Sequence, residues 1–291
     1  MRLAGERIAA AFRAACIAEL QALKPGNVHV LAAGHRMTVD DFVRSAEVAA
    51  APLSAPGARV GRRILDAVEA TFAAVGANTN LGIILLCAPL AAAAETNPSD
   101  LRSRLETVLD ALDTEDANLA FRAIVRAAPA GLGRVARNDV FAPARVTLRL
   151  AMADAADRDR IARQYVTGYA DVLERGLPLL AAPAARGWEP TWSVPAVYLG
   201  FLSAFPDSHV VRKYGLAVAE DVRGTAAKFH AALQTSRDPA HLKEELSAWD
   251  ADLKARGINP GTSADLTVAT LFAHDLAADL AAILPSARNS G

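Results

Sequence analysis

Aromatic residues, cysteine and lysine are all scarce in this sequence of 291 residues. Aromatic side chains make up only 5% of it, and alternating β-branched runs are few, which argues against an extensive β-sheet. The only cysteines, Cys16 and Cys87, lie in apolar stretches. We therefore expect two reduced core thiols in a reducing compartment and no disulfide framework.

A surplus of charge and a long apolar run are also lacking. The formal net charge is −1, so there is no basic field to attract nucleic acid or an anionic membrane. The longest apolar run, residues 81–94, is shorter than the ~20 residues of a membrane-spanning helix. Arg2, Glu6 and Arg7 interrupt the N-terminus, unlike a secretory signal. We predict a soluble, cytoplasmic protein with neither nucleic acid nor a membrane as its partner.

Several familiar catalytic patterns are missing as well. The sequence has no Walker loop, no GxGxxG, no Cys/His zinc pattern and no nucleophile elbow. His230, His241 and His274 lack the spacing of metal ligands, and residues 157–160 are typical of a solvated helix start. None of these segments predicts a catalytic site.

What the sequence has in quantity is alanine, the residue with the highest helix propensity. Apolar residues recur three or four apart, as at Leu266, Ala269, Phe272 and Leu276, which places them on one helical face. We predict an all-α protein, a single globular multi-helix domain over residues 1–291 with a polar cleft formed by helix ends. The helices are expected at 2–23, 38–51, 57–75, 78–95, 99–112, 114–127, 144–154, 157–182, 191–205, 214–234, 239–255 and 262–284.

Local start signals support several of these helices. Residues 38–41 and 262–265 each fit a capping box with aspartate in place of glutamate. Ser99 and Thr114 are predicted N-caps because each precedes a helical pattern and carries a side-chain oxygen.

Two polar clusters interrupt the apolar pattern in the first third of the chain. Lys24 precedes Pro25-Gly26 and follows Glu19, so it suits either a phosphate or the C-terminal end of a helix. Residues 78–80, Asn-Thr-Asn, open an apolar helix, where they suit a ribose or phosphate, or Asn78 or Thr79 as an N-cap. Gly82, one turn later, would let a ligand approach the backbone.

Two further clusters lie toward the C-terminus. Asp207 and Ser208 are followed by His209, Arg212 and Lys213, an unusual density of mixed polar groups for so apolar a chain. These residues suit a ligand, although the first two could cap a helix and the cations could face solvent. In residues 259–266, a ligand and a capping box are again both compatible with the pattern.

Taken in order, these clusters resemble the motifs of the triphosphoribosyl-dephospho-coenzyme A synthase family, accessory enzymes of citrate lyase and malonate decarboxylase. The similar segments are residues 24–28 (K-P-G-x-V), 34–37 with 42–45 (G-x-H-x-D-M…F-x-x-S-A), 78–82 (N-T-H-K-G), 206–208 (P-D-[ST]) and 260–266 (P-G-x-[ST]-A-D-L). Leu81, Asn80 and His29 stand where the family has lysine, histidine and aspartate. With Arg212-Lys213 and the loop at 131–133, they are more similar to an archaeal and methylotroph branch.

The resemblance implies a transferase that joins ATP to the 2′-hydroxyl of 3′-dephospho-coenzyme A and releases adenine, with Mg²⁺ on the triphosphate. It also implies roles for site residues. Asp207 and Asp265 are expected to act as base or metal ligands, with Glu19 as a further catalytic carboxylate. The residues expected to bind nucleotide or phosphate are Lys24, Asn78, Thr79, Asn80, Ser208, Arg212 and Lys213.

Two alternatives to this function stay open, and the oligomeric state is a separate expectation. The acceptor could instead be part of a one-carbon carrier cofactor such as tetrahydromethanopterin, which the changes at His29 and Leu81 would suit. The protein could also bind a nucleotide without turnover. A homodimer would suit its alanine-rich helices.

Overall fold

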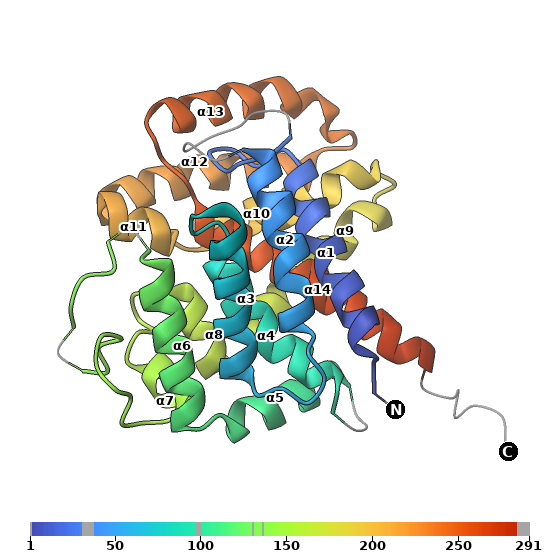
Figure 1. Ribbon diagram of the computed structural model, residues 1–291. Helices are drawn as coiled ribbons and strands as arrows, with labels where there is room; N and C mark the ends of the chain where they lie inside the picture. Colours follow the sequence, from blue (N-terminus) through green and yellow to red (C-terminus); the bar gives the residue numbers. More distant parts are fainter. Residues whose placement is uncertain (1, 31–37, 97–99, 130, 136, 284–291) are drawn as a thin grey trace, which may run out of the picture.

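The computed structural model describes residues 2–30, 38–96, 100–129, 131–135 and 137–283, and the motif at residues 34–37 and Ser99 lie outside them. The described residues form fourteen α-helices and no β-strand, which confirms the all-α prediction (Figure 1). The α-helices are α1 (Gly5–Gln21), α2 (Val39–Leu53), α3 (Val60–Val75), α4 (Leu81–Ala94), α5 (Leu101–Ala111), α6 (Thr114–Ala127), α7 (Leu148–Ala153), α8 (Arg160–Thr167), α9 (Leu177–Ala185), α10 (Ser193–Ala204), α11 (Ser208–Tyr214), α12 (Leu216–Thr235), α13 (Lys243–Ala255) and α14 (Gly261–Ile283). A π-helical turn spans Asp171–Gly176, and 3₁₀ turns span Pro190–Trp192 and Pro239–Leu242.

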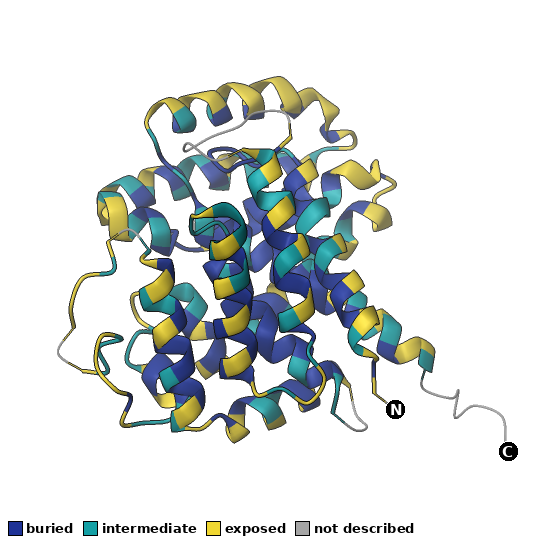
Figure 2. Cartoon of the chain, viewed as in Figure 1, coloured by how far each residue is buried: buried dark blue, intermediate teal, exposed yellow. Residues whose placement is uncertain are grey.

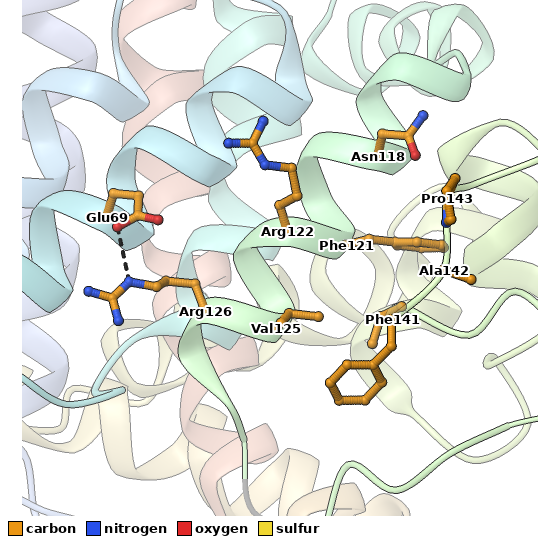
Figure 3. Close-up of a pocket in the computed structure, with 10 residues that line it drawn as sticks. Glu69, Asn118, Phe121, Arg122, Val125, Arg126, Phe141, Ala142 and Pro143 are labelled. Atoms are coloured by element: carbon orange, nitrogen blue, oxygen red, sulfur yellow. Dashed lines mark hydrogen bonds and ion pairs between the residues drawn. The ribbon is translucent and has the colours of Figure 1, made fainter.

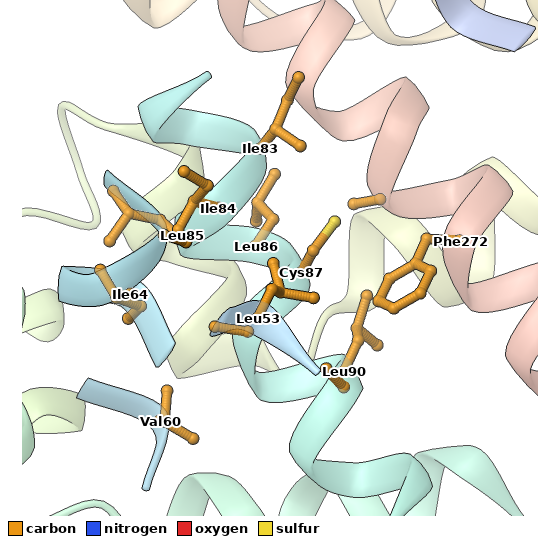
Figure 4. Packing of buried hydrophobic residues seen from close by; sticks show 14 of the residues in the cluster. Leu53, Val60, Ile64, Ile83, Ile84, Leu85, Leu86, Cys87, Leu90 and Phe272 are labelled. Atoms are coloured by element: carbon orange, nitrogen blue, oxygen red, sulfur yellow. The ribbon is translucent and has the colours of Figure 1, made fainter. Parts of the chain in front are cut away.

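The centre of the fold is α4, which packs against α3, α5 and α14. Its sequence is apolar on every side, and nearly all of its side chains are buried, as expected of a helix enclosed by others. Figure 4 shows Leu86, Cys87 and Leu90 of α4 packed among Leu53 of α2 and Phe272 of α14. Burial is deepest in these central helices, whereas α13 exposes one face along its length (Figure 2). Both cysteines are free, as predicted.

The predicted helix at 157–182 is wrong, because the chain breaks at Gly168 and Tyr169, which both have positive φ. The cause is the docking of two tyrosines on α4. Tyr165 donates a hydrogen bond to the carbonyl of Leu85 (2.6 Å), and Tyr169 donates one to the carbonyl of Leu86 (2.9 Å). Pro89 cannot give Leu85 the usual helical N–H, so the tyrosine hydroxyl takes its place.

Helix starts agree with the sequence signals in part. The capping box of Thr38 and Asp41 is confirmed, but α6 is capped by Asp113, which makes Thr114 the first helical residue rather than the cap. The capping box at 262–265 is wrong, since α14 begins one residue earlier at Gly261. α11, at residues 208–214, was not predicted.

The last helix, α14, crosses the molecule and contacts α1, α4, α10 and α11 among others (Figure 1). By length and composition alone it could cross a membrane, but half of its most apolar stretch is buried against the other helices. A core helix of a water-soluble protein meets the same criteria. Its N-terminal end lies beside α11, where the polar motifs of the second half of the chain come together.

Candidate active site

A cavity of about 840 Å³, here called the inner cavity, lies among the ends of α1, α4, α8, α11 and α14 and the α6–α7 connection. This volume is within the roughly 300–1,000 Å³ of small-molecule sites. The predicted site residues that line it are Glu19, Asn78, Thr79, Arg212 and Asp265. The predicted site residues outside its lining are Lys24, Asn80, Asp207, Ser208 and Lys213. The four motifs therefore meet at one cavity, although only part of each motif faces it.

Asp265, near the start of α14, is one of the carboxylates that line this cavity. Within the described residues it forms no hydrogen bond and no ion pair. Burial raises its pKa well above the usual range, the charges of Asp207, Glu19 and Asp159 add to this effect, and the charge of Arg212 opposes it. Its Oδ2 atom lies against Gly82, so closely that a β-carbon there would come within 3.0 Å of the carboxylate. The glycine expected to admit a ligand thus admits a carboxylate of the protein.

Lys24 is fully buried and its ammonium group is occupied by the chain itself. It contacts Glu19 Oε1 (2.6 Å), the carbonyl of Val28 (2.7 Å) and Asn27 Oδ1 (2.8 Å). An ammonium group has three hydrogens to donate, so contact with a phosphate would require the release of one of these partners. Burial raises the pKa of Glu19, while Lys24 acts in the opposite direction. Lys24 therefore compensates the charge of a carboxylate that lines the cavity.

The turn at Lys24 is anchored to the C-terminal motif. The N–H of Asn27 donates to the carbonyl of Lys24 (3.0 Å), and Gly26 has a φ of +82°, as a type II turn requires. Asn27 Nδ2 donates to Asn259 Oδ1 (2.8 Å), and the N–H of Gly26 donates to Asp250 Oδ1 (2.8 Å). These bonds hold the two motifs together at one end of the cavity.

His29, a departure from the family motif, lies in this network rather than in the cavity lining. It is buried beside Asp250 (3.2 Å) and Lys254 (3.1 Å). Burial acts to raise the pKa of Asp250, but hydrogen bonds from His29, Lys254 and the N–H of Gly26 lower it overall.

Asp207 occupies the junction of α11 and α14 and is completely buried. Its Oδ1 accepts from the N–H groups of His209 (3.0 Å) and Val210 (3.2 Å), which caps α11. Its Oδ2 accepts from the N–H and the hydroxyl of Ser263 (both 2.8 Å) at the start of α14. Two bonds to each oxygen fill the lone pairs of a carboxylate. Burial raises the pKa of Asp207.

The other predicted residues outside the cavity lining also contact the protein. Ser208 Oγ accepts from the N–H of Arg160 (2.8 Å), and Lys213 lies 5.0 Å from the ring of its neighbour Tyr214. Asn80 is buried at the start of α4, and its Nδ2 atom has no hydrogen-bond partner in the described part of the chain. At the same helix start, Asn78 Oδ1 accepts from the N–H of Leu81 (3.1 Å), but the N-cap is Asn80, so the prediction of Asn78 or Thr79 as the N-cap is wrong.

The cavity lining includes residues that the sequence did not identify. Arg158 and Asp159 were assigned to a solvated helix start, but both line the cavity. Asp159 Oδ1 caps α8, and its Oδ2 lies 3.4 Å from Arg212. The signal that could have found Arg158 and Asp159 is the charge alternation at residues 157–160, immediately before a helical pattern. His209, part of the polar cluster noted in the sequence, also lines the cavity from α11.

Residues 5–282 match the CitG family, described as ATP:dephospho-CoA triphosphoribosyl transferase. Among solved structures, one from Archaeoglobus fulgidus, provisionally named triphosphoribosyl-dephospho-coA synthase, is similar with a TM-score of 0.60 and 25% identity. That match covers 79% of this chain and 95% of the other. None of the curated protein sequences matches. Because the match spans nearly the whole chain, this protein belongs to the family of ATP:dephospho-CoA triphosphoribosyl transferases.

Proposed function

We propose that the protein transfers the triphosphoribosyl group of ATP to the 2′-hydroxyl of 3′-dephospho-coenzyme A, with Asp265 as the general base. One observation carries the assignment of the base. Asp265 is the predicted catalytic carboxylate that both lines the cavity and lacks a hydrogen bond or ion pair to any described residue. Glu19 is neutralised by Lys24, and Asp207 is saturated by four hydrogen bonds.

The proposed reaction forms one bond and breaks one. The acceptor oxygen bonds to C1 of the ATP ribose as the bond from C1 to N9 of adenine breaks. Asp265 takes the hydroxyl proton, and adenine gains one proton as it leaves, so protons balance overall. The reacting ribose has oxocarbenium character in such substitutions, which a nearby carboxylate stabilises. A raised pKa makes Asp265 a stronger base than an ordinary aspartate.

The triphosphate requires positive charge, and arginines supply it in this cavity. Arg137, Arg158 and Arg212 line the side formed by α8, α11 and the α6–α7 connection. Arginine recognises phosphate through several N–H groups at once. In this proposal Lys24 positions Glu19, and Lys213 has no direct part in binding.

Mg²⁺ fits the donor set of the cavity, and Asp159 is the residue that would hold it, which leaves Asp265 free to act as the base. Mg²⁺ is often bound by one or two carboxylates together with substrate phosphates, so no dedicated protein cage is needed. The described residues contain no cluster of three His, Cys, Asp or Glu side chains suited to a metal. Bound Mg²⁺ would neutralise triphosphate charge. Asp207 has no lone pair left for a metal ion.

The test is release of adenine from ATP in the presence of dephospho-coenzyme A. We expect Asp265→Asn to lower kcat by about 10²–10⁴-fold, the usual contribution of a general base. Asp275→Asn is the matched control, because Asp275 lies on the same helix but does not line the cavity. Normal turnover by Asp265→Asn would remove Asp265 from the mechanism.

Leu81 favours a second candidate function, in which the acceptor is not dephospho-coenzyme A. This apolar side chain lines the inner cavity at the position where the family motif has lysine. In that case adenine would be released from ATP when an acceptor from a one-carbon carrier such as tetrahydromethanopterin is added, but not when dephospho-coenzyme A is added. Tight ATP binding without adenine release for any acceptor would indicate a protein without turnover. A cytoplasmic location and a homodimer stay predictions.

A further inference from the structure

A second cavity, here called the outer cavity, lies between α6 and the α6–α7 connection (Figure 3). Its volume is about 550 Å³. Phe121 and Val140 line both cavities, so the two spaces adjoin at these side chains. Adjoining spaces can hold different parts of the same elongated ligand.

The position of each residue around α6 explains this arrangement. Ile124 borders the inner cavity, Asn118, Arg122 and Val125 border the outer one, and Phe121 between them borders both. Residues three or four apart share a helical face, so neighbouring stripes of α6 serve the two cavities. The α6–α7 connection runs past both, and its end is fixed where Asn118 Oδ1 accepts from the N–H of Ala144 (2.8 Å).

The outer cavity combines an apolar floor with unused hydrogen-bond donors. Phe121, Val125 and Phe141 supply the floor, and Phe141 is 47% exposed, with Cζ of Arg134 lying 4.1 Å from its ring centroid. Arg122 has no hydrogen bond or ion pair to any residue that the structure describes, whereas the neighbouring Arg126 is paired with Glu69 (3.0 Å; Figure 3). Such a surface suits a ligand that alternates apolar carbons with carbonyl oxygens.

We propose that the apolar side of the inner cavity and the outer cavity together bind the pantetheine arm of the acceptor. This inference rests on the proposed function, which places the acceptor's 2′-hydroxyl at Asp265. The arm extends from the same nucleotide and carries a branched apolar segment, two amides and a terminal thiol. Its carbons would lie on Phe121 and Val140, and its amide carbonyls would accept from Arg122 in the outer cavity.

An Ala142→Trp variant tests the subsite, because Ala142 is exposed and lines only the outer cavity. The indole would fill the proposed space without touching the inner cavity. Ala184→Trp is the matched control, since Ala184 is exposed on α9 and lines neither cavity. We expect Ala142→Trp to raise KM for dephospho-coenzyme A by about tenfold, with KM for ATP changed by less than about twofold.

Binding measurements separate this inference from the proposed function. Calorimetry should give dephospho-coenzyme A about tenfold tighter binding than ADP, which lacks the arm, and Ala142→Trp should abolish that difference. An unchanged KM and unchanged binding in Ala142→Trp would overturn the subsite. A rise in KM for ATP alone would overturn it too, because the space would then belong to ATP. Absence of adenine release by the unaltered protein would instead overturn the proposed function, while the calorimetric comparison would still decide the subsite.

Discussion

The carboxylate of Asp265 occupies the space that a side chain at position 82 would need. Gly82 lies in the first turn of α4, and Ile161 Cδ1 would also stand 2.8 Å from a β-carbon added there. The backbone of α4 and the carboxylate of α14 can approach this closely only because residue 82 is glycine. The position of the proposed base is therefore set by the residue opposite it.

Gly82→Ala should displace Asp265 and lower kcat while the protein stays folded. A misplacement of about 1 Å can reduce a rate ~10²-fold, and we expect a loss of that order. Helix propensity cannot explain such a loss, because alanine stabilises a helix interior by about 0.5–1 kcal/mol relative to glycine. Gly224→Ala in α12 is the control, since an added β-carbon there meets nothing. Equal kcat values for the two variants would show that the close approach is unimportant.

The rate of adenine release should fall on the acid side at a pH well above the ordinary aspartate pKa of about 3.9. Asp265 must be deprotonated to act as a base, and burial and the charges of Asp207, Glu19 and Asp159 raise its pKa. Activity is thus present above the raised pKa and is lost as the pH falls through it.

Asp159→Asn should move this acid limb to lower pH, because it removes one of the charges that raise the pKa of Asp265. Asparagine can still cap α8, so the helix start is retained. The measurement is the pH profile of kcat for both proteins. If the acid limb of the pH profile of kcat does not move, a group other than Asp265 controls it.

Lys24→Met should destabilise the protein by about 3–5 kcal/mol, because it leaves the buried Glu19 carboxylate without its cation. The double variant Glu19→Gln/Lys24→Met should lose less than the sum of the single variants. Urea unfolding of all four proteins measures this coupling. Additive losses would show that the contact of 2.6 Å contributes little.

Asp207→Asn should lower the free energy of unfolding by about 1–3 kcal/mol. The amide NH₂ that replaces one carboxylate oxygen would be a donor facing the N–H or O–H donors that this oxygen now accepts from. Turnover should persist in the folded protein, since Asp207 does not line the cavity. Thermal unfolding and kcat together test this role. Lost turnover with unchanged stability would return Asp207 to the catalytic centre.

The sequence alone determined the helical class, the buried α4 and the capping box at Thr38, because propensity, apolar content and caps act within one or two turns of a helix. It also identified the motifs that meet at the inner cavity. It could not predict the break at Gly168 and Tyr169, where hydrogen bonds to a helix some eighty residues away override a continuous helical period.

Only the tertiary structure decided which polar residue of each motif faces the cavity. Asp207 and Asp265 look equivalent in the sequence, yet one joins the starts of α11 and α14 and the other opens onto the cavity beside Gly82. Lys24, which the sequence offered for a phosphate, instead forms an ion pair with Glu19 inside the protein. The direction of a side chain at a helix end depends on how helices distant in sequence pack around it, and no local pattern records that packing.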